Sequence, residues 1–175
     1  MKFFGLVTRI ASEAFSKGVL KAMAIPFSLI ALVVSAKVQL PFWPVPMTMQ
    51  TVALGISAIS LPWYVGFTSC IGYLTIGAFG CPVLATKIGF FGPTFGYLMA
   101  FPIKSLIVSR YSSASSIIWS EVFVLLCGTL WLSYLIGSSA IWSGFLIFIP
   151  ASVLKMGMTI SVASHCRTFR SWIEK

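Results

Sequence analysis

The sequence predicts an all-α integral membrane protein with six transmembrane helices and with both termini in the cytoplasm. Three observations predict this fold class, and the first is composition. Of the 175 residues, 58% are hydrophobic and 9% are charged, and the mean hydropathy is +0.99. A soluble domain carries charge on about a quarter of its residues, so this chain has too few charges to cover a surface that faces water.

The second observation is the length of the uncharged segments, 38–86 and 122–154, which contain no Asp, Glu, Lys, Arg or His. One helical crossing takes roughly 20 apolar residues, so the first segment is long enough for two crossings. Strict alternation of apolar and polar residues is absent, which excludes a membrane β-barrel and leaves helices. We expect spans at 21–37, 48–61, 64–85, 93–110, 117–135 and 144–165. Several of them are short, which predicts tilted or re-entrant segments.

The third observation is the distribution of the 12 Lys and Arg residues. With the N-terminus in the cytoplasm, the outer loops hold only Lys37 and Lys87, and Lys155 falls inside the last span. The other basic residues lie on inner segments, as the positive-inside rule requires. This rule explains the formal charge of +9 better than nucleic-acid binding, because no basic stripe with interleaved aromatic residues is present. The predicted location is the inner (cytoplasmic) membrane, crossed several times.

The whole chain, 1–175, is predicted to form a single membrane domain. Residues 1–20 are basic and have apolar residues at helical spacing, which predicts an interfacial helix on the cytoplasmic side. Residues 21–165 form the predicted six-helix bundle. Residues 166–175 are the predicted cytoplasmic tail.

The sequence gives little support to an enzyme. It has no Gly-rich phosphate loop, so this chain is not expected to hydrolyse ATP. It has no metal-ligand set and no Ser–His arrangement, and its four cysteines lack CxxC spacing. We therefore predict no catalytic residue, no metal and no cofactor, and binding rather than catalysis.

Lys155 is the first candidate binding residue. A lysine within an apolar helix costs about 2.5–3.5 kcal/mol on insertion scales, so it requires a partner. The three acids, Glu13, Glu121 and Glu174, all fall near the cytoplasmic side of the predicted topology, which makes Lys155 the only ionisable group expected within the membrane. An unpaired lysine that faces an outward cavity would attract a carboxylate from outside. The alternative is that Lys155 extends to the membrane surface and binds nothing.

The second candidate is the proline-rich segment 38–50, VQLPFWPVPMTMQ. Its three prolines exclude a helix interior and favour extended backbone. A stiff loop that carries Phe42 and Trp43 at the outer face would form a lid over a pocket, and Gln50 would face inward from the first turn of the next helix. The alternative is a plain interfacial turn with Trp43 in the aromatic belt. A third segment, 89–97, contains Gly92 and Gly96 at GxxxG spacing, which indicates close helix packing.

These segments resemble the BioY family, the biotin-binding S components of energy-coupling factor (ECF) transporters. The resemblance rests on 35–51 (SAKVQLPFWPVPMTMQT), 73–83 (YLTIGAFGCPV) and 92–98 (GPTFGYL), and it extends over roughly 20–165. It implies biotin binding near the outer face. It also implies partners: a membrane coupling (T) subunit and two ATPase subunits. The substrate-binding residues that it implies are Gln50, Tyr73, Thr94, Tyr97 and Lys155.

The chain departs from the family pattern at two places. Where the family reads Pro-Gly-Asp-x-x-Lys, this chain has Ser152 in the position of the aspartate and keeps Lys155. The loop near Lys87 is altered, and Lys87 adds a second positive group at the expected pocket mouth. A serine hydroxyl accepts an N–H less strongly than a carboxylate does, so we expect weaker biotin binding or a different ligand. Small residues at Ala24 and Ser28 have the spacing through which the family docks its coupling subunit.

Four interpretations remain open at this point. The first is a biotin-binding S component, and the second is an S component for another small anionic vitamin or a biotin analogue. The third is a membrane enzyme, which would need a catalytic group in a cavity. The fourth is a structural membrane protein.

Overall fold

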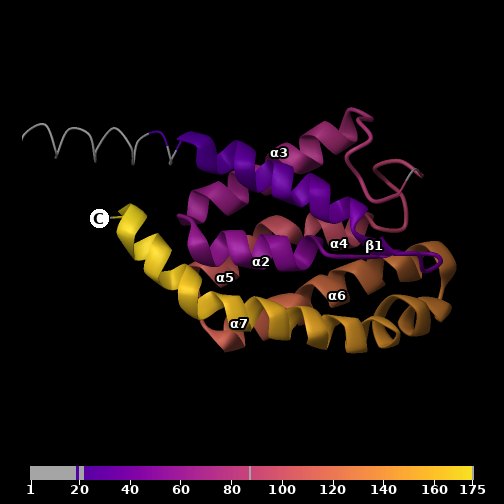
Figure 1. Cartoon of the computed structure of the whole chain (residues 1–175). Helices are drawn as coiled ribbons and strands as arrows, with labels where there is room; N and C mark the ends of the chain where they lie inside the picture. The colour runs from indigo at the N-terminus through magenta and orange to yellow at the C-terminus, as the bar shows by residue number, and fades with distance from the viewer. Residues whose placement is uncertain (1–18, 20–21, 87, 175) are drawn as a thin grey trace, which may run out of the picture.

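The protein is a bundle of helices with a short hairpin at one end (Figure 1). The computed structural model describes residue 19 and residues 22–86 and 88–174, with side chains up to Ala163. The predicted interfacial helix at 1–20 therefore lies outside the described residues, apart from Val19. In chain order the elements are the helix Ala22–Lys37, β1 (Gln39–Leu40), β2 (Met47–Thr48), α2 (Gln50–Ser60), α3 (Trp63–Ala78), α4 (Phe95–Met99), α5 (Phe101–Tyr111), α6 (Ala114–Ile136), a π-helical segment (Ile141–Leu146) and α7 (Phe148–Glu174).

The predicted helical segments are present, and their ends follow local chemistry. Helix α3 ends at Ala78, earlier than the predicted 85, and Gly80 follows with φ of 82°, a conformation that glycine adopts without strain. The predicted segment 93–110 is divided into α4 and α5 at Ala100. Pro102 lies in the first turn of α5, where its missing N–H costs nothing. Helix α7 continues to Glu174 and so extends through the predicted tail.

The proline-rich segment forms an antiparallel hairpin in place of a simple turn. Gln39 pairs with Thr48, and Leu40 pairs with Met47. The hairpin turns its apolar residues Val45 and Met47 into the core, where they are 3% and 6% exposed. In Figure 1 the hairpin and the turn between α6 and α7 lie at the same end of the bundle, and the labelled C-terminus lies at the opposite end.

Small residues bring the helices into close contact. A Cβ atom on Gly96 would lie 2.4 Å from Trp131 Cβ and 3.2 Å from the Cα of Gly128, so α4 and α6 pack almost backbone to backbone. This confirms the close packing predicted for Gly96. Gly55 on α2 meets Thr159 on α7 in the same way, at 2.7 Å. Such contacts fix the position of α7, which carries part of the pocket described below.

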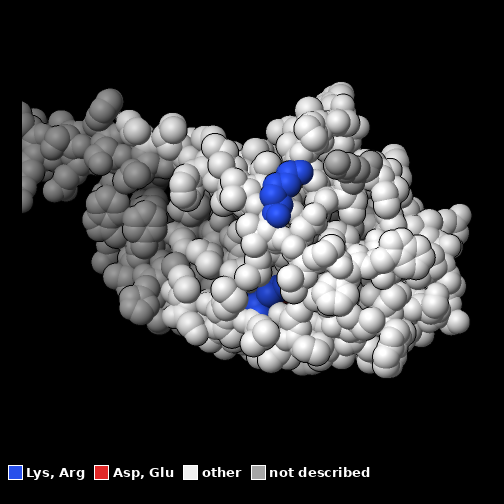
Figure 2. Space-filling view, turned by 45° about the vertical axis from the view of Figure 1, so that its right-hand side comes forward, with Lys and Arg blue, Asp and Glu red and all other residues white. Residues whose placement is uncertain are grey.

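The outer surface suits a lipid environment. The helix Ala114–Ile136 and the stretch Ile141–Ala163 are long and apolar enough to cross a membrane, judged by length and composition. Figure 2 shows a face that is almost entirely uncharged, with small basic areas and no acidic residue in view. Lipid-facing helices are expected to have this surface, because charged side chains are costly in hydrocarbon.

Candidate functional site

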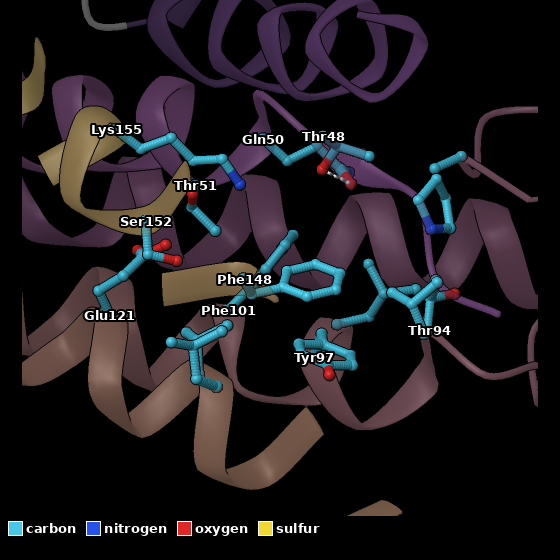
Figure 3. A pocket seen from close by; sticks show the side chains of 16 residues that line it. Thr48, Gln50, Thr51, Thr94, Tyr97, Phe101, Glu121, Phe148, Ser152 and Lys155 are labelled. Carbon is cyan, nitrogen blue, oxygen red and sulfur yellow. Dashed lines mark hydrogen bonds between the residues drawn. The ribbon is translucent and has the colours of Figure 1, made fainter. Parts of the chain in front are cut away.

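A pocket lies at the hairpin end of the bundle, between the hairpin, α2, α4, α6 and α7 (Figure 3). Its volume is about 50 Å³, well below the roughly 300–1,000 Å³ of ordinary ligand sites. A ligand of vitamin size therefore requires the surrounding segments to move apart. The lining residues are Val45, Pro46, Thr48, Gln50, Thr51, Ala85, Thr94, Tyr97, Leu98, Phe101, Glu121, Val124, Leu125, Phe148, Ser152 and Lys155.

Helix α7 supplies Ser152 and Lys155 to this pocket. The two residues are three positions apart, so they lie on the same helix face. Both are buried, at 2% and 9% exposure, so Lys155 does not extend to the surface of the described structure. The Ser152 hydroxyl has no hydrogen-bond partner among the described residues. It is therefore available to a ligand.

Glu121 lies in the same pocket as Lys155, and the sequence reasoning missed it. Glu121 on α6 is 3% exposed and forms a buried ion pair with Lys104 on α5, which is 2% exposed. The prediction that Lys155 is the only ionisable group within the membrane is therefore wrong, because two more buried charges lie in the bundle. A physical signal was present in the sequence: Lys104 and Glu121 occupy neighbouring spans at similar depth, and opposite charges buried in an apolar medium pair.

The pocket wall opposite Glu121 in Figure 3 carries Gln50 and Thr48. The Thr48 hydroxyl donates to Gln50 Oε1 at 3.1 Å, which orients the amide. Gln50 is 2% exposed, and its Nε2 makes no hydrogen bond to a described residue, nor does the Thr51 hydroxyl. Unpaired buried polar atoms are costly, so these groups favour a polar ligand or bound water. The predicted inward orientation of Gln50 is the one that the structure has.

Aromatic rings fill the middle of the pocket (Figure 3). Tyr97 stacks on Phe148, with ring centroids 5.9 Å apart. The Tyr97 hydroxyl donates to the carbonyl of Gly144 at 2.7 Å, so only its ring faces the pocket. Thr94 also lines the pocket. Tyr73 does not: it is fully buried, and its hydroxyl donates to the Val83 carbonyl at 3.3 Å.

Two segments border the pocket beside the helices: the hairpin, and residues 79–86, which reach it through Ala85. Lys37 is the last residue of the first helix and comes just before the hairpin. Its ammonium donates to the carbonyls of Pro82 (2.7 Å) and Leu84 (2.8 Å), and these hydrogen bonds link the two segments. Phe42 and Trp43 do not line the pocket; they are 44% and 87% exposed. The hairpin covers the pocket through Val45, Pro46 and Thr48 instead.

Three predicted residues remain to be placed. Lys87 lies outside the described residues. Ala24 and Ser28 are on the face of their helix that packs against the rest of this chain, at 8% and 0% exposure. Docking of a partner through these two residues stays a prediction, and it would require a surface that is covered here.

The site combines an apolar aromatic centre with a few polar groups at its edges, which is typical of small-molecule sites. One ammonium (Lys155), one carboxylate (Glu121), one amide (Gln50) and four Ser or Thr residues (Thr48, Thr51, Thr94 and Ser152) line the same pocket. No cluster of three or more potential metal-ligating side chains occurs among the described residues. The arrangement can bind a small polar molecule that has an anionic group and an apolar body.

One solved structure shares this fold. The chain matches the crystal structure described as "the S-component for biotin from an ECF-type ABC transporter", with a TM-score of 0.74 and 21% identity, over 87% of this chain and 93% of that chain. At that identity the likeness establishes the fold alone.

The family follows from the sequence comparisons. Residues 11–171 match the model of the BioY family. The probable biotin transporter BioY of Rickettsia prowazekii is 31% identical over 167 residues, which cover 87% of this chain and 86% of the relative. Biotin transporter BioY2 of Lactococcus lactis subsp. cremoris is 31% identical over 132 residues, 66% of this chain and 72% of the relative. The chain belongs to the BioY family, as the motifs predicted.

Proposed function

We propose that this protein is the substrate-binding S component of an ECF-type importer and that it captures biotin at the outer membrane face. It is a transport protein rather than an enzyme. The observation that carries the proposal is a pocket in a BioY-family chain in which Lys155, Gln50, Thr51 and Ser152 surround an aromatic centre. Biotin offers a match: an apolar body, a ureido group and a single carboxylate.

Lys155 is the residue proposed to hold the carboxylate of the ligand. Its side chain is 9% exposed and shares the pocket with Glu121. Glu121 is already paired with Lys104, so the ammonium of Lys155 keeps an unbalanced positive charge. Burial of an unbalanced charge is costly, and an anionic ligand relieves that cost.

The finer topology belongs to the same proposal. Six spans, with both termini in the cytoplasm, place the hairpin and the pocket at the outer face of the inner membrane. This arrangement agrees with the distribution of basic residues along the chain. Transport then requires a membrane coupling (T) subunit and ATPase subunits, because this chain contains no phosphate-binding loop.

Two measurements test the proposal. The first is titration of the purified protein in lipid nanodiscs with biotin and with biotin methyl ester, which lacks the negative charge. We expect saturable binding of biotin and weaker binding of the ester. The second is growth of a biotin auxotroph on trace biotin with the chain, with and without coupling subunits. No binding in the titration, together with no rescue of growth, would reject the proposal.

A second candidate ligand class rests on one observation, the presence of Ser152 in the pocket. A hydroxyl can both donate and accept, so it accommodates head groups that a carboxylate would repel. The second candidate is therefore another small anionic vitamin or a biotin analogue. Competition of labelled biotin against a panel of vitamins and against desthiobiotin separates the two candidates.

A further inference from the structure

A second concave site, the α3–α5 groove, lies at the end of the bundle opposite the hairpin. Trp63, the first residue of α3, lines it together with Leu106, Ser109 and Arg110 of α5. Helix α2 runs away from the hairpin into α3, and α5 leads into α6, which runs back toward the hairpin end (Figure 1). The groove is therefore far from the pocket described above. Its volume is about 400 Å³, which is ordinary for a ligand site.

Aromatic side chains indicate where this groove lies relative to a membrane. Trp63 and Tyr64 at the start of α3 and Tyr111 at the end of α5 are all exposed. The rings of Trp63 and Tyr64 pack edge to face, with centroids 6.2 Å apart. Exposed Trp and Tyr residues concentrate where phospholipid head groups meet hydrocarbon, because one part of each ring system is apolar and the other is polar. The α3–α5 groove is therefore at the level of the head groups.

Arg110 gives the groove a positive charge that no described side chain balances. It lies in the last turn of α5 and is exposed. Among the described side chains, which end at Ala163, Glu121 is the only acid, and it pairs with Lys104 inside the bundle. A guanidinium is a planar donor that binds a phosphate through two parallel hydrogen bonds. The charge in the groove therefore suits a phosphate.

We propose that the α3–α5 groove binds an anionic phospholipid of the surrounding membrane through its phosphate. Arg110 binds the phosphate, and the apolar walls formed by Trp63 and Leu106 suit the start of the acyl chains, which a free phosphate lacks. An anionic lipid fits better than a zwitterionic one, because no described carboxylate in the groove can receive a head-group ammonium. In the proposed topology this end faces the cytoplasm, where basic sites between transmembrane helices bind anionic head groups.

Native mass spectrometry of the purified protein in detergent tests this, because it counts the lipids bound to each chain. The protein is titrated with phosphatidylglycerol, with phosphatidylcholine of the same acyl chains, and with inorganic phosphate. Arg110→Gln removes the charge, and Leu106→Trp fills the groove without a change in charge. Lys37→Gln is the matched control, because it removes one positive charge at the hairpin end. Thermal unfolding checks that each variant is folded.

We expect the wild type to bind one phosphatidylglycerol more tightly than phosphatidylcholine. We expect Arg110→Gln to lose about tenfold in affinity for phosphatidylglycerol, the effect of one hydrogen bond to a charged group. Leu106→Trp should also weaken this binding, and Lys37→Gln should keep the wild-type affinity.

Equal affinity of the wild type and Arg110→Gln for phosphatidylglycerol would overturn the inference. An equal loss in Lys37→Gln would also overturn it, because net charge alone would then explain the result. Inorganic phosphate that binds as tightly as the lipid would show that the groove does not read a lipid. The titration uses no biotin, so a negative result leaves the proposed function intact.

Discussion

Tyr97 on α4 lies directly over Gly128 on α6, so closely that a Cβ atom on residue 128 would be 2.1 Å from the tyrosine ring. The same ring forms the aromatic centre of the pocket through its stacking on Phe148. Helix packing and the shape of the binding site therefore depend on one contact.

Gly128→Ala is predicted to displace Tyr97 from this position. Overpacking of this kind costs about 1–3 kcal/mol, and the displaced ring would also narrow the pocket. We expect a lower unfolding temperature and weaker biotin binding, measured on the same nanodisc sample. Gly157→Ala is the matched control, because a Cβ atom there meets nothing within 4 Å. Equal stability of the two variants would contradict the packing argument.

Lys155→Met is predicted to weaken biotin binding by about 10–150-fold, since a hydrogen bond to a charged group contributes about 1.5–3 kcal/mol. Methionine keeps most of the apolar stem and removes the charge. Binding of biotin methyl ester should change much less, and comparison of the two ligands by titration isolates the contribution of the charge. An equal loss for both ligands would show that Lys155 does not read the carboxylate.

Lys104→Met alone is predicted to destabilise the protein strongly, because Glu121 would remain buried without its partner. Breaking a buried ion pair from one side costs about 3–5 kcal/mol, whereas replacing both partners is often neutral. Thermal unfolding of Lys104→Met, Glu121→Gln and the double variant measures this directly. We expect the double variant to recover most of the stability that Lys104→Met loses; additive losses would argue against the pairing.

Lys37→Met is predicted to speed both the binding and the release of biotin, because it removes the ammonium that holds the backbone of Pro82 and Leu84 beside the pocket. Two hydrogen bonds to backbone carbonyls at about 1 kcal/mol each correspond to a change of about 10–30-fold in the release rate. Stopped-flow fluorescence with biotin measures both rates. Lys37→Arg retains the donors and should behave closer to the wild type. Release rates that stay unchanged in Lys37→Met would mean that the cover opens elsewhere.

Ser152→Ala is predicted to reduce biotin affinity only modestly, by about two- to tenfold. Its hydroxyl is buried and has no partner among the described residues, so the ligand can supply one, and a neutral hydrogen bond contributes about 0.5–1.5 kcal/mol. Titration against the wild type checks this. A loss as large as that of Lys155→Met would give Ser152 a larger role than its chemistry suggests.

The helical segments could be predicted because the length of an uncharged apolar segment can be read directly from the sequence. The predicted segments 48–61 and 117–135 correspond to α2 and α6 within a few residues. Gln50, Ser152 and Lys155 could also be placed in a common pocket, since the family motifs carried them. Whether the chain crosses the membrane six times stays a prediction.

The Lys104–Glu121 pair could not be placed in the same way. The two residues are 17 positions apart, and the rotation of α5 and α6 about their axes decides whether their side chains meet. The predicted topology put Lys104 and Glu121 near the cytoplasmic side of the membrane. It therefore did not predict that Glu121 and Lys155 line the same pocket. Phe42 and Trp43 illustrate a related difficulty: all three residues, Val45 included, lie in the turn that joins the two strands, where Val45 is buried and the two larger rings are exposed, so residue type alone did not indicate which side chain faces inward.

Lys37 holds Pro82 and Leu84 through their backbone rather than through their side chains. Its ammonium binds main-chain oxygens, which every amino acid possesses, so the attachment sets no demand on side chains at positions 82 and 84. The two positions differ in what else constrains them. Leu84 is buried in the hydrophobic core, so its side chain is fixed by packing, whereas Pro82 is exposed and can be replaced while the anchor remains intact.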